Sequence, residues 1–295
     1  MTTMTVLVRR MRTSDRRVLT VIGDVFASPG GVVGVTFVVV MLLAGIIGPM
    51  LTPFSPTAPD VLHTSQSPSE LHWLGTDSLG RDVLSRTLSG IAVSLRIGVF
   101  SVLIAACIGI PLGLLAGYYR PVQVVMARVV EVLMVFPGLV LALGLAAILG
   151  GGSERNLTIA LIVSTLVPFI QVTRAEVMRM RNLEFVEAAQ TTGASGARIL
   201  GLHLFPNAIS AILVQLTVHV PSAVLGEAAL SFLGLGVQPP QPSLGIMLSE
   251  AQAELIRGGW WMALFPGLAI LAITIGFNLF GDALRDAMDP KSRRV

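Results

Sequence analysis

The residues of this chain that could do chemistry are few, and none is spaced for catalysis. A loop that binds ATP for hydrolysis needs the pattern GxxxxGK[ST], in which a lysine contacts the phosphates. The single lysine, Lys291, stands in DPKSRR without a glycine at the required spacing, which excludes that route. No HExxH or GxSxG pattern occurs, and the one cysteine, Cys107, permits neither a disulfide framework nor a thiolate cluster. We expect a non-catalytic chain without a metal or other cofactor of its own.

One segment has a distinctive spacing of residues but no catalytic group. It consists of an acid, two small residues, a glycine and a proline: Glu187, Ala188, Ala189, Gly193 and Pro206. The surrounding residues 182–206 have helix-forming composition interrupted at Gly193, so we expect two short helices with a bend. Small alanines allow close approach to a partner, and Glu187 could hydrogen-bond an arginine there. The alternative is an amphipathic helix lying on the bilayer surface.

The elements that position these residues must lie in a membrane. Of the 295 residues, 53% are hydrophobic and only 13% are charged, about half the charged share of an ordinary soluble domain. The mean hydropathy is +0.80. The net charge of +3 is too small to indicate a nucleic-acid partner. A lipid bilayer is therefore the expected surrounding, and no nucleic acid is expected to bind.

Six apolar stretches are long enough, at roughly 20 residues, to cross a bilayer as helices. They are residues 31–51, 97–118, 132–152, 156–173, 207–226 and 258–281. The third can begin near residue 122, and prolines inside several of them indicate kinks. The sequence predicts an all-α, polytopic membrane protein with six transmembrane helices.

The distribution of basic residues predicts the orientation. Fourteen of the 20 basic residues lie in the leader, in the turn after the second span, in the loop after the fourth span or in the tail, and four lie in the opposite connectors. By the positive-inside rule, both termini and residues 182–206 should be cytoplasmic. The two long connectors on the other side, residues 52–90 and 233–257, should be ordered and too short to be separate domains.

Within the spans, two features are open to two interpretations each. Glu227 lies in the fifth span after Pro221, with no basic residue near it in sequence. An intramembrane carboxylate either lines a pore or gate or is a protonated or locally hydrogen-bonded packing residue. The second span carries a face of small residues, Gly109, Gly113 and Gly117, which could pack inside the chain or at a dimer interface. Arg128 and Glu131, three residues apart in the third span, should pair with each other.

The spacing from Glu187 to Pro206 resembles the EAA loop of the permease subunits of binding-protein-dependent ABC importers. His203 and Phe205 depart from that pattern at its end. Three further blocks narrow the resemblance to the peptide and nickel class, and within it to the "C" permease component of dipeptide and oligopeptide importers. They are HWLGTDSLGRDVLSR at 72–86, ALSFLGLGVQPP at 229–240 and GDALRDAMDP at 281–290. Leu244 stands where this family more often has Trp.

The resemblance implies a type I ABC importer permease fold and several partners. These are a second, homologous permease, two ABC ATPase subunits or domains that bind ATP and Mg²⁺, and an extracytoplasmic solute-binding protein. The EAA loop would dock on the ATPases, and dipeptides or short oligopeptides would cross the bacterial plasma membrane by alternating access. Expected boundaries are a cytoplasmic region 1–30, a first helix with its outer segment 31–90, a permease domain 91–288 and a tail 289–295.

The GTDSLGRD segment has two interpretations in this setting. Its Gly and Asp content is typical of a tight loop in which charged groups pair locally. Alternatively it forms an outer-mouth loop that shapes the surface on which a binding protein docks. The residues concerned are Asp77, Gly80, Arg81 and Asp82.

Other functions stay open at this point. Nickel, haem or glutathione could replace peptides as cargo, because the binding protein largely selects it. An ion-coupled secondary transporter would also have several spans and a membrane acid, although its inverted repeats are absent. A structural or assembly protein of the membrane is a third class, and it predicts no ATPase partner.

Overall fold

The computed structural model describes residues 20–288. The expectations for most of the leader and for the tail, including Lys291, lie outside the described residues. The helices are α2 (Pro29–Leu51), α3 (Val83–Tyr118), α4 (Arg120–Met134), α5 (Gly138–Ile148), α6 (Glu154–Met180), α7 (Glu184–Thr191), α8 (Gly196–Ile199), the π-helix η1 (Leu200–Leu204), α9 (Phe205–Phe232), α10 (Leu244–Leu255) and α11 (Trp261–Met288). Residues 20–288 contain no β-strand beyond one isolated bridge between Thr76 and Asp82. The all-α prediction is confirmed.

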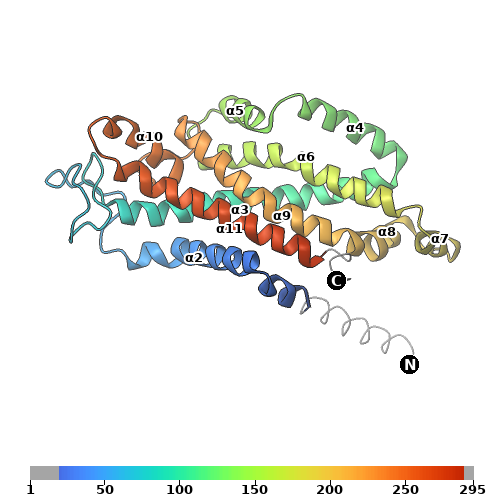
Figure 1. The fold of residues 1–295 in the computed structure, drawn as a ribbon. Coiled ribbons are helices and arrows are strands. Elements are labelled where there is room, and N and C mark those ends of the chain that lie inside the picture. The colour runs from blue at the N-terminus through green and yellow to red at the C-terminus, as the bar shows by residue number, and fades with distance from the viewer. Residues whose placement is uncertain (1–19, 289–295) are drawn as a thin grey trace.

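The long helices run side by side, and Figure 1 shows what lies at each end of the bundle. One end, called here the loop end, carries α7 and α8 together with the start of α2 and the close of α11. The other, called the far end, carries the irregular segment 52–82, the segment 233–243 and α10. Helix α3 packs against α2, α6, α9 and α11. Both described chain ends therefore lie at the same end of the bundle as the EAA loop.

The third predicted span is not one helix. It is divided into α4 and α5, which are bent by 87° relative to each other. Pro137 lies at the break, with φ −53° and ψ 137°, and its missing N–H and ring clash prevent the helix from continuing. Five helices of the described chain are long and apolar enough to cross a membrane, and six spans result if the bent pair counts as one.

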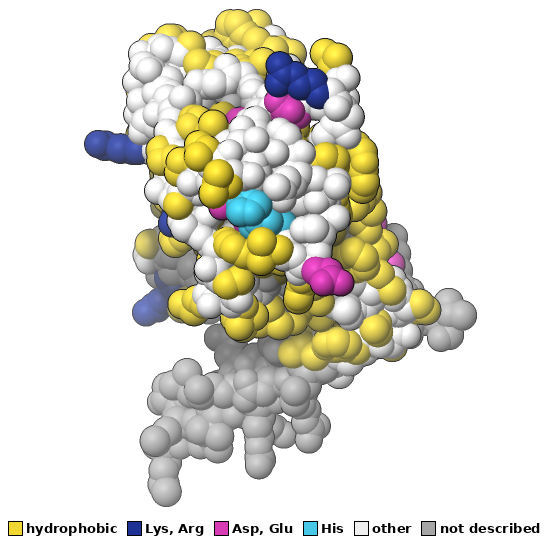
Figure 2. Space-filling model, turned by 90° about the vertical axis from the view of Figure 1, so that its left-hand side faces the viewer, with side chains coloured by type: hydrophobic (Ala, Val, Ile, Leu, Met, Phe, Trp, Pro, Cys, Tyr) yellow, Lys and Arg dark blue, Asp and Glu magenta, His cyan; other side chains and the backbone are white. Residues whose placement is uncertain are grey.

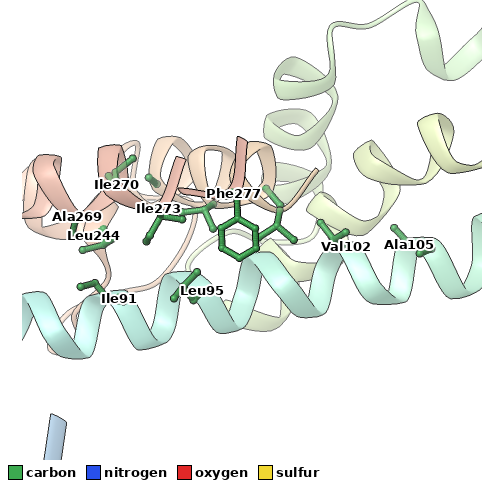
Figure 3. Packing of buried hydrophobic residues seen from close by; sticks show 14 of the residues in the cluster. Ile91, Leu95, Val102, Ala105, Leu244, Ala269, Ile270, Ile273 and Phe277 are labelled. Carbon is green, nitrogen blue, oxygen red and sulfur yellow. The ribbon is translucent and has the colours of Figure 1, made fainter. Parts of the chain in front are cut away.

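The main core lies between α3, α9, α10 and α11. Its side chains include Leu95 and Val102 of α3, Leu244 of α10, and Ile273 and Phe277 of α11, and Figure 3 shows how they meet in the space between the helices. Many other apolar side chains, especially on α2 and α4–α5, stay exposed in the isolated chain. Exposed apolar helix surface of this kind is expected where lipid or another subunit replaces water.

The glycine face of α3 packs inside the chain, against α6. Its members are Gly109, Gly113 and Gly117. A Cβ atom on Gly113 would lie 2.6 Å from Cβ of Thr173, and one on Gly117 would lie 2.5 Å from Cβ of Val177. The two helices approach this closely because α3 has no side chain there. Of the two interpretations of this face, the structure shows the intrachain one.

Candidate functional site

The EAA loop forms two short helices, as predicted. Helix α7 ends near Gly193, which has φ +81°, a left-handed conformation that favours glycine. Its N–H donates to the carbonyl of Gln190 over 2.9 Å, and the next N–H, that of Ala194, donates to Ala189 over 3.0 Å. Helix α8 then begins after Ser195, whose side chain caps it. The bend therefore comes from a glycine helix terminus.

The two alanines of the motif do different things. Ala189 is 8% exposed and packs with Val186, Ile199 and other side chains of the loop's own apolar cluster. Ala188 and Glu187 are exposed. The methyl group of Ala189 therefore holds α7 onto the base of the loop in this structure, and close approach of a partner to the two alanines stays a prediction. The face left for a partner contains Glu187 and Ala188.

The loop is joined rigidly to the membrane helices. The π-helix η1 connects α8 to α9. Pro206 is the second residue of α9, where a proline is tolerated because the first turn of a helix does not need its backbone N–H group. Leu200 and Leu204 of η1 pack in the same apolar cluster as Val177 and Met180 in the last turn of α6. Movement of the loop would therefore displace α6 and α9 together.

The GTDSLGRD segment forms a buried ionic cluster at the far end. Nε of Arg81 lies 2.6 Å from Oδ2 of Asp77, which confirms local pairing. The cluster also contains two residues that the sequence did not single out, Arg86 and Glu250. One carboxylate oxygen of Glu250, on α10, lies 3.0 Å from Arg81 and 2.6 Å from Arg86. Both arginine side chains are at most 3% exposed, so the cluster holds the segment to α3 and α10.

Two more members of that segment have structural roles. The carboxylate of Asp82 caps the N-terminus of α3 by accepting a hydrogen bond from Ser85 N–H, and it also lies 2.9 Å from Nδ1 of the buried His72. Gly80 has φ +76°, and a Cβ atom there would overlap the carbonyl of Asp60. On the surface nearby, the His63 ring at 2.7 Å and the Leu62 N–H lower the pKa of the Asp60 carboxyl.

The far-end surface above this cluster is mixed in character. Seen from that end, apolar side chains lie among polar groups with a few charged ones and a histidine (Figure 2). Trp73, Val61 and Leu62 of the 52–82 segment are at least 71% exposed, and Ile256 beyond α10 is 91% exposed. The buried ionic cluster thus lies beneath an exposed, partly apolar surface. This surface, which includes Val61, Leu62, Trp73 and Ile256, is called the far-end rim.

Glu227 and Pro221 do not line an open pathway in this structure. Both are buried, and the Glu227 side chain is 0% exposed. Its two carboxyl oxygens accept hydrogen bonds from Ser94 of α3 over 2.6 Å and from Ser231 of α9 over 2.7 Å. In this structure hydroxyl groups satisfy the carboxyl group of Glu227 between packed helices, as a hydrogen-bonded packing residue requires. A role of Glu227 and Pro221 in a pore or gate stays a prediction.

Known proteins give this geometry its context. Residues 109–294 match the family described as binding-protein-dependent transport system inner membrane component. Residues 24–68 match the N-terminal TM domain of oligopeptide transport permease C.

Several named proteins are similar over most of the chain. A dipeptide transport system permease protein DppC of Alkalihalophilus pseudofirmus is 39% identical over 89% of this chain and 86% of its own length. That of Haemophilus influenzae is 35% identical over 90% of this chain and 92% of its own. A glutathione transport system permease protein GsiD of Pectobacterium atrosepticum is 42% identical over 77% of this chain and 75% of its own. The chain belongs to the family of inner membrane components of binding-protein-dependent transport systems.

Proposed function

We propose that this chain forms half of the translocation pathway of an ATP-driven importer of dipeptides or short oligopeptides. The observation that carries the proposal is the exposed EAA loop, which α6 and α9 hold rigidly at one end of a membrane helix bundle. Similarity to dipeptide permeases supports the cargo. Transport would run by alternating access, with the open side switched by work received at the loop.

The loop would receive that work from two ABC ATPase subunits or domains, which bind ATP and Mg²⁺. Glu187 and Ala188 supply the exposed docking face, where a charged hydrogen bond from an arginine of the ATPase can form. Ala189, Gly193 and Pro206 shape the loop behind that face. This chain would hydrolyse nothing itself.

The orientation follows from the same assignment. With ATPases at the loop end, the loop and both termini are cytoplasmic, and the far end faces outward. The basic residues Arg174, Arg179, Arg181 and Arg198 in and beside the loop support this direction. The far-end rim would then meet the extracytoplasmic binding protein, with Asp77, Gly80, Arg81 and Asp82 fixing the shape of its base. A second, homologous permease would cover part of the apolar surface of α4 and α5.

The test is transport by the full complex reconstituted with its ATPases and binding protein. Glu187→Ala removes a charged hydrogen bond, for which mutational losses of about 1.5–3 kcal/mol are typical, so we expect ATP-dependent uptake to fall about tenfold or more. Glu184→Ala is the matched control, because Glu184 is also exposed on α7, one turn earlier. Uptake that continues without ATP, or that is equal in both variants, would contradict the proposal.

Glutathione is the second candidate cargo, because GsiD proteins are as similar to this chain as the dipeptide permeases are. The two cargoes are distinguished by the ligand that the binding protein retains, identified by mass spectrometry, and by which of alanyl-alanine and glutathione stimulates ATP hydrolysis. Nickel or haem as the ligand that the binding protein retains would exclude both peptides and glutathione as the cargo. The family assignment leaves the ion-coupled transporter without support.

A further inference from the structure

A chain of hydrogen bonds at the far end runs from Glu227 to the backbone of the following segment. Ser231 donates to Glu227 and also accepts a hydrogen bond from the N–H of Val237 over 3.2 Å. Ser94 donates to the other carboxyl oxygen and accepts from the N–H of Leu244 over 3.2 Å. Each serine hydroxyl therefore bridges the carboxyl group of Glu227 and one backbone N–H group, that of Val237 or that of Leu244. These two hydrogen-bonded bridges are called relays here.

The relays join three elements at a single buried point. Ser94 belongs to α3, Glu227 and Ser231 belong to α9, and Leu244 is the first residue of α10. Ser243, the N-cap of α10, adds a third hydroxyl beside the carboxyl group. Hydrogen bonds within a buried network cannot be exchanged for water, so removing its central acceptor leaves several donors unsatisfied.

Close backbone packing reinforces the junction. A Cβ atom on Gly236 would overlap Oγ of Ser231, and one on Gly245 would overlap the carbonyl oxygen of Ala228. At Gly236 and Gly245 the chain therefore approaches α9 more closely than any residue with a side chain would allow. The polar relays and the glycine contacts fix the same region to the same helix.

Helix α9 links this junction to the opposite end of the molecule. It begins at Phe205, at the boundary of the EAA loop, and continues to Phe232, as Figure 1 shows. At 1.5 Å per residue, these 28 residues span about 42 Å. Pro221 lies inside α9, but the helix is continuous from Phe205 to Phe232, and a continuous helix that is held at both ends transmits displacement between them.

We propose that Glu227 is a positioning residue that fastens segment 233–243 and α10 to α9 and α3, so that movement of the EAA loop repositions the far-end surface. The inference rests on the proposed coupling role of that loop. It assigns to Glu227 neither contact with cargo nor a place in the pathway. What it predicts is a loss of coupling between the two ends when the relays are broken.

The experiment uses the full complex, with purified binding protein and alanyl-alanine, and a reporter in the far-end segment. In a Cys107→Ser background, Gln238→Cys places an accessible thiol there, since Gln238 is exposed. Maleimide labelling is compared between the nucleotide-free and the ATP-trapped complex. We expect the labelling rate to differ at least threefold between the two states, and Glu227→Ala to abolish that difference.

The same variants are assayed for uptake per ATP hydrolysed. We expect Glu227→Ala to lower this ratio about tenfold, while basal ATP hydrolysis continues. Glu227→Gln should recover part of the ratio, because its amide oxygen accepts from one serine while its NH₂ group cannot accept from the other. Ser222→Ala is the matched control: this exposed serine of α9 bonds only to the carbonyl of Val218, so both readouts should keep their wild-type values.

A second pair of variants tests the inference if the first variant does not fold. If Glu227→Ala does not assemble, Ser94→Ala and Ser231→Ala each break one relay and keep the carboxyl group, and each should lower both readouts. Assembled variants with wild-type coupling and labelling would overturn the inference, as would wild-type labelling that ignores nucleotide. The proposed function fails separately, if the wild-type complex shows no ATP-dependent uptake or if Glu187→Ala transports normally.

Discussion

The two ends of the bundle are built in opposite ways. At the far end, the buried side chains of Arg81 and Arg86 form an ionic cluster with the partly buried Glu250, and Glu227 is enclosed by serines. At the loop end, short helices stand out from the bundle with Glu187 and Ala188 exposed. The buried contacts hold the far-end surface in one shape, whereas the loop end exposes side chains to a partner.

The difference indicates how firmly each end of the bundle fixes the shape of its surface. A buried ionic cluster is costly to assemble and strongly destabilising to break on one side, so it defines one geometry for the elements it joins. The EAA loop contains few such contacts, and a glycine terminus and the apolar cluster that it shares with α6 and α9 hold it. Its surface can therefore adapt to a partner while its base stays attached to α6 and α9.

The largest effect should come from breaking the far-end cluster. Glu250→Ala removes one of the two carboxylates that the buried Arg81 and Arg86 share and leaves only Asp77, so we expect it to destabilise the protein by about 3 kcal/mol. Thermal unfolding of the purified complex measures the loss. Glu250→Gln, which keeps the volume and one acceptor oxygen, should lose less. Equal stability of the alanine variant and the wild type would mean that the cluster does not define the far end.

The next effect concerns the packing that connects the two ends. Gly113→Ala places a methyl group 2.6 Å from Cβ of Thr173, so α3 and α6 must separate, at a cost of about 1–3 kcal/mol. Gly144→Ala is the matched control, because Gly144 lies in α5 with nothing within 4 Å of the added atom. That variant should be neutral or slightly stabilising. Similar thermal stability of the two variants would contradict the packing role.

The sequence predicted the local features of this molecule and missed the distant ones. Apolar length located five long helices, and Gly193 located the bend of the EAA loop, because each signal lies within one stretch of chain. Pro137 signalled a kink, but an 87° break depends on what packs around it. Arg128 and Glu131 pair as their spacing predicts, at 2.8 Å.

The missed residues share one property, a partner far away in sequence. Glu250 is 164 residues from Arg86, and Ser94 is 133 residues from Glu227. No periodicity or motif in one sequence reveals such pairs. The only available signal was an unpaired membrane acid in the fifth span, which correctly marked Glu227 as requiring a partner but could not say which.

At the loop end, Gly193→Ala should have a smaller effect on stability. The glycine has φ +81° and open space around it, so only backbone strain opposes the methyl group, at about 1 kcal/mol. Uptake should fall more than stability does, because the angle between α7 and α8 sets the docking face. The control is Gly201→Ala in η1, which also has open space but no left-handed backbone. If the two variants transported equally, the bend would have no role in coupling.

The smallest effect should come from the ion pair on α4. The side chains of Arg128 and Glu131 are 80% and 60% exposed in the isolated chain, and an exposed pair of this spacing contributes about 0.3–0.5 kcal/mol. Arg128→Ala should therefore leave the melting temperature of the complex nearly unchanged, and added salt should remove what difference remains. A loss several times larger and insensitive to salt would show that lipid or a second permease, and not water, surrounds the pair. Buried charge would then be a property of α4 in the assembled membrane complex as well as of the far end.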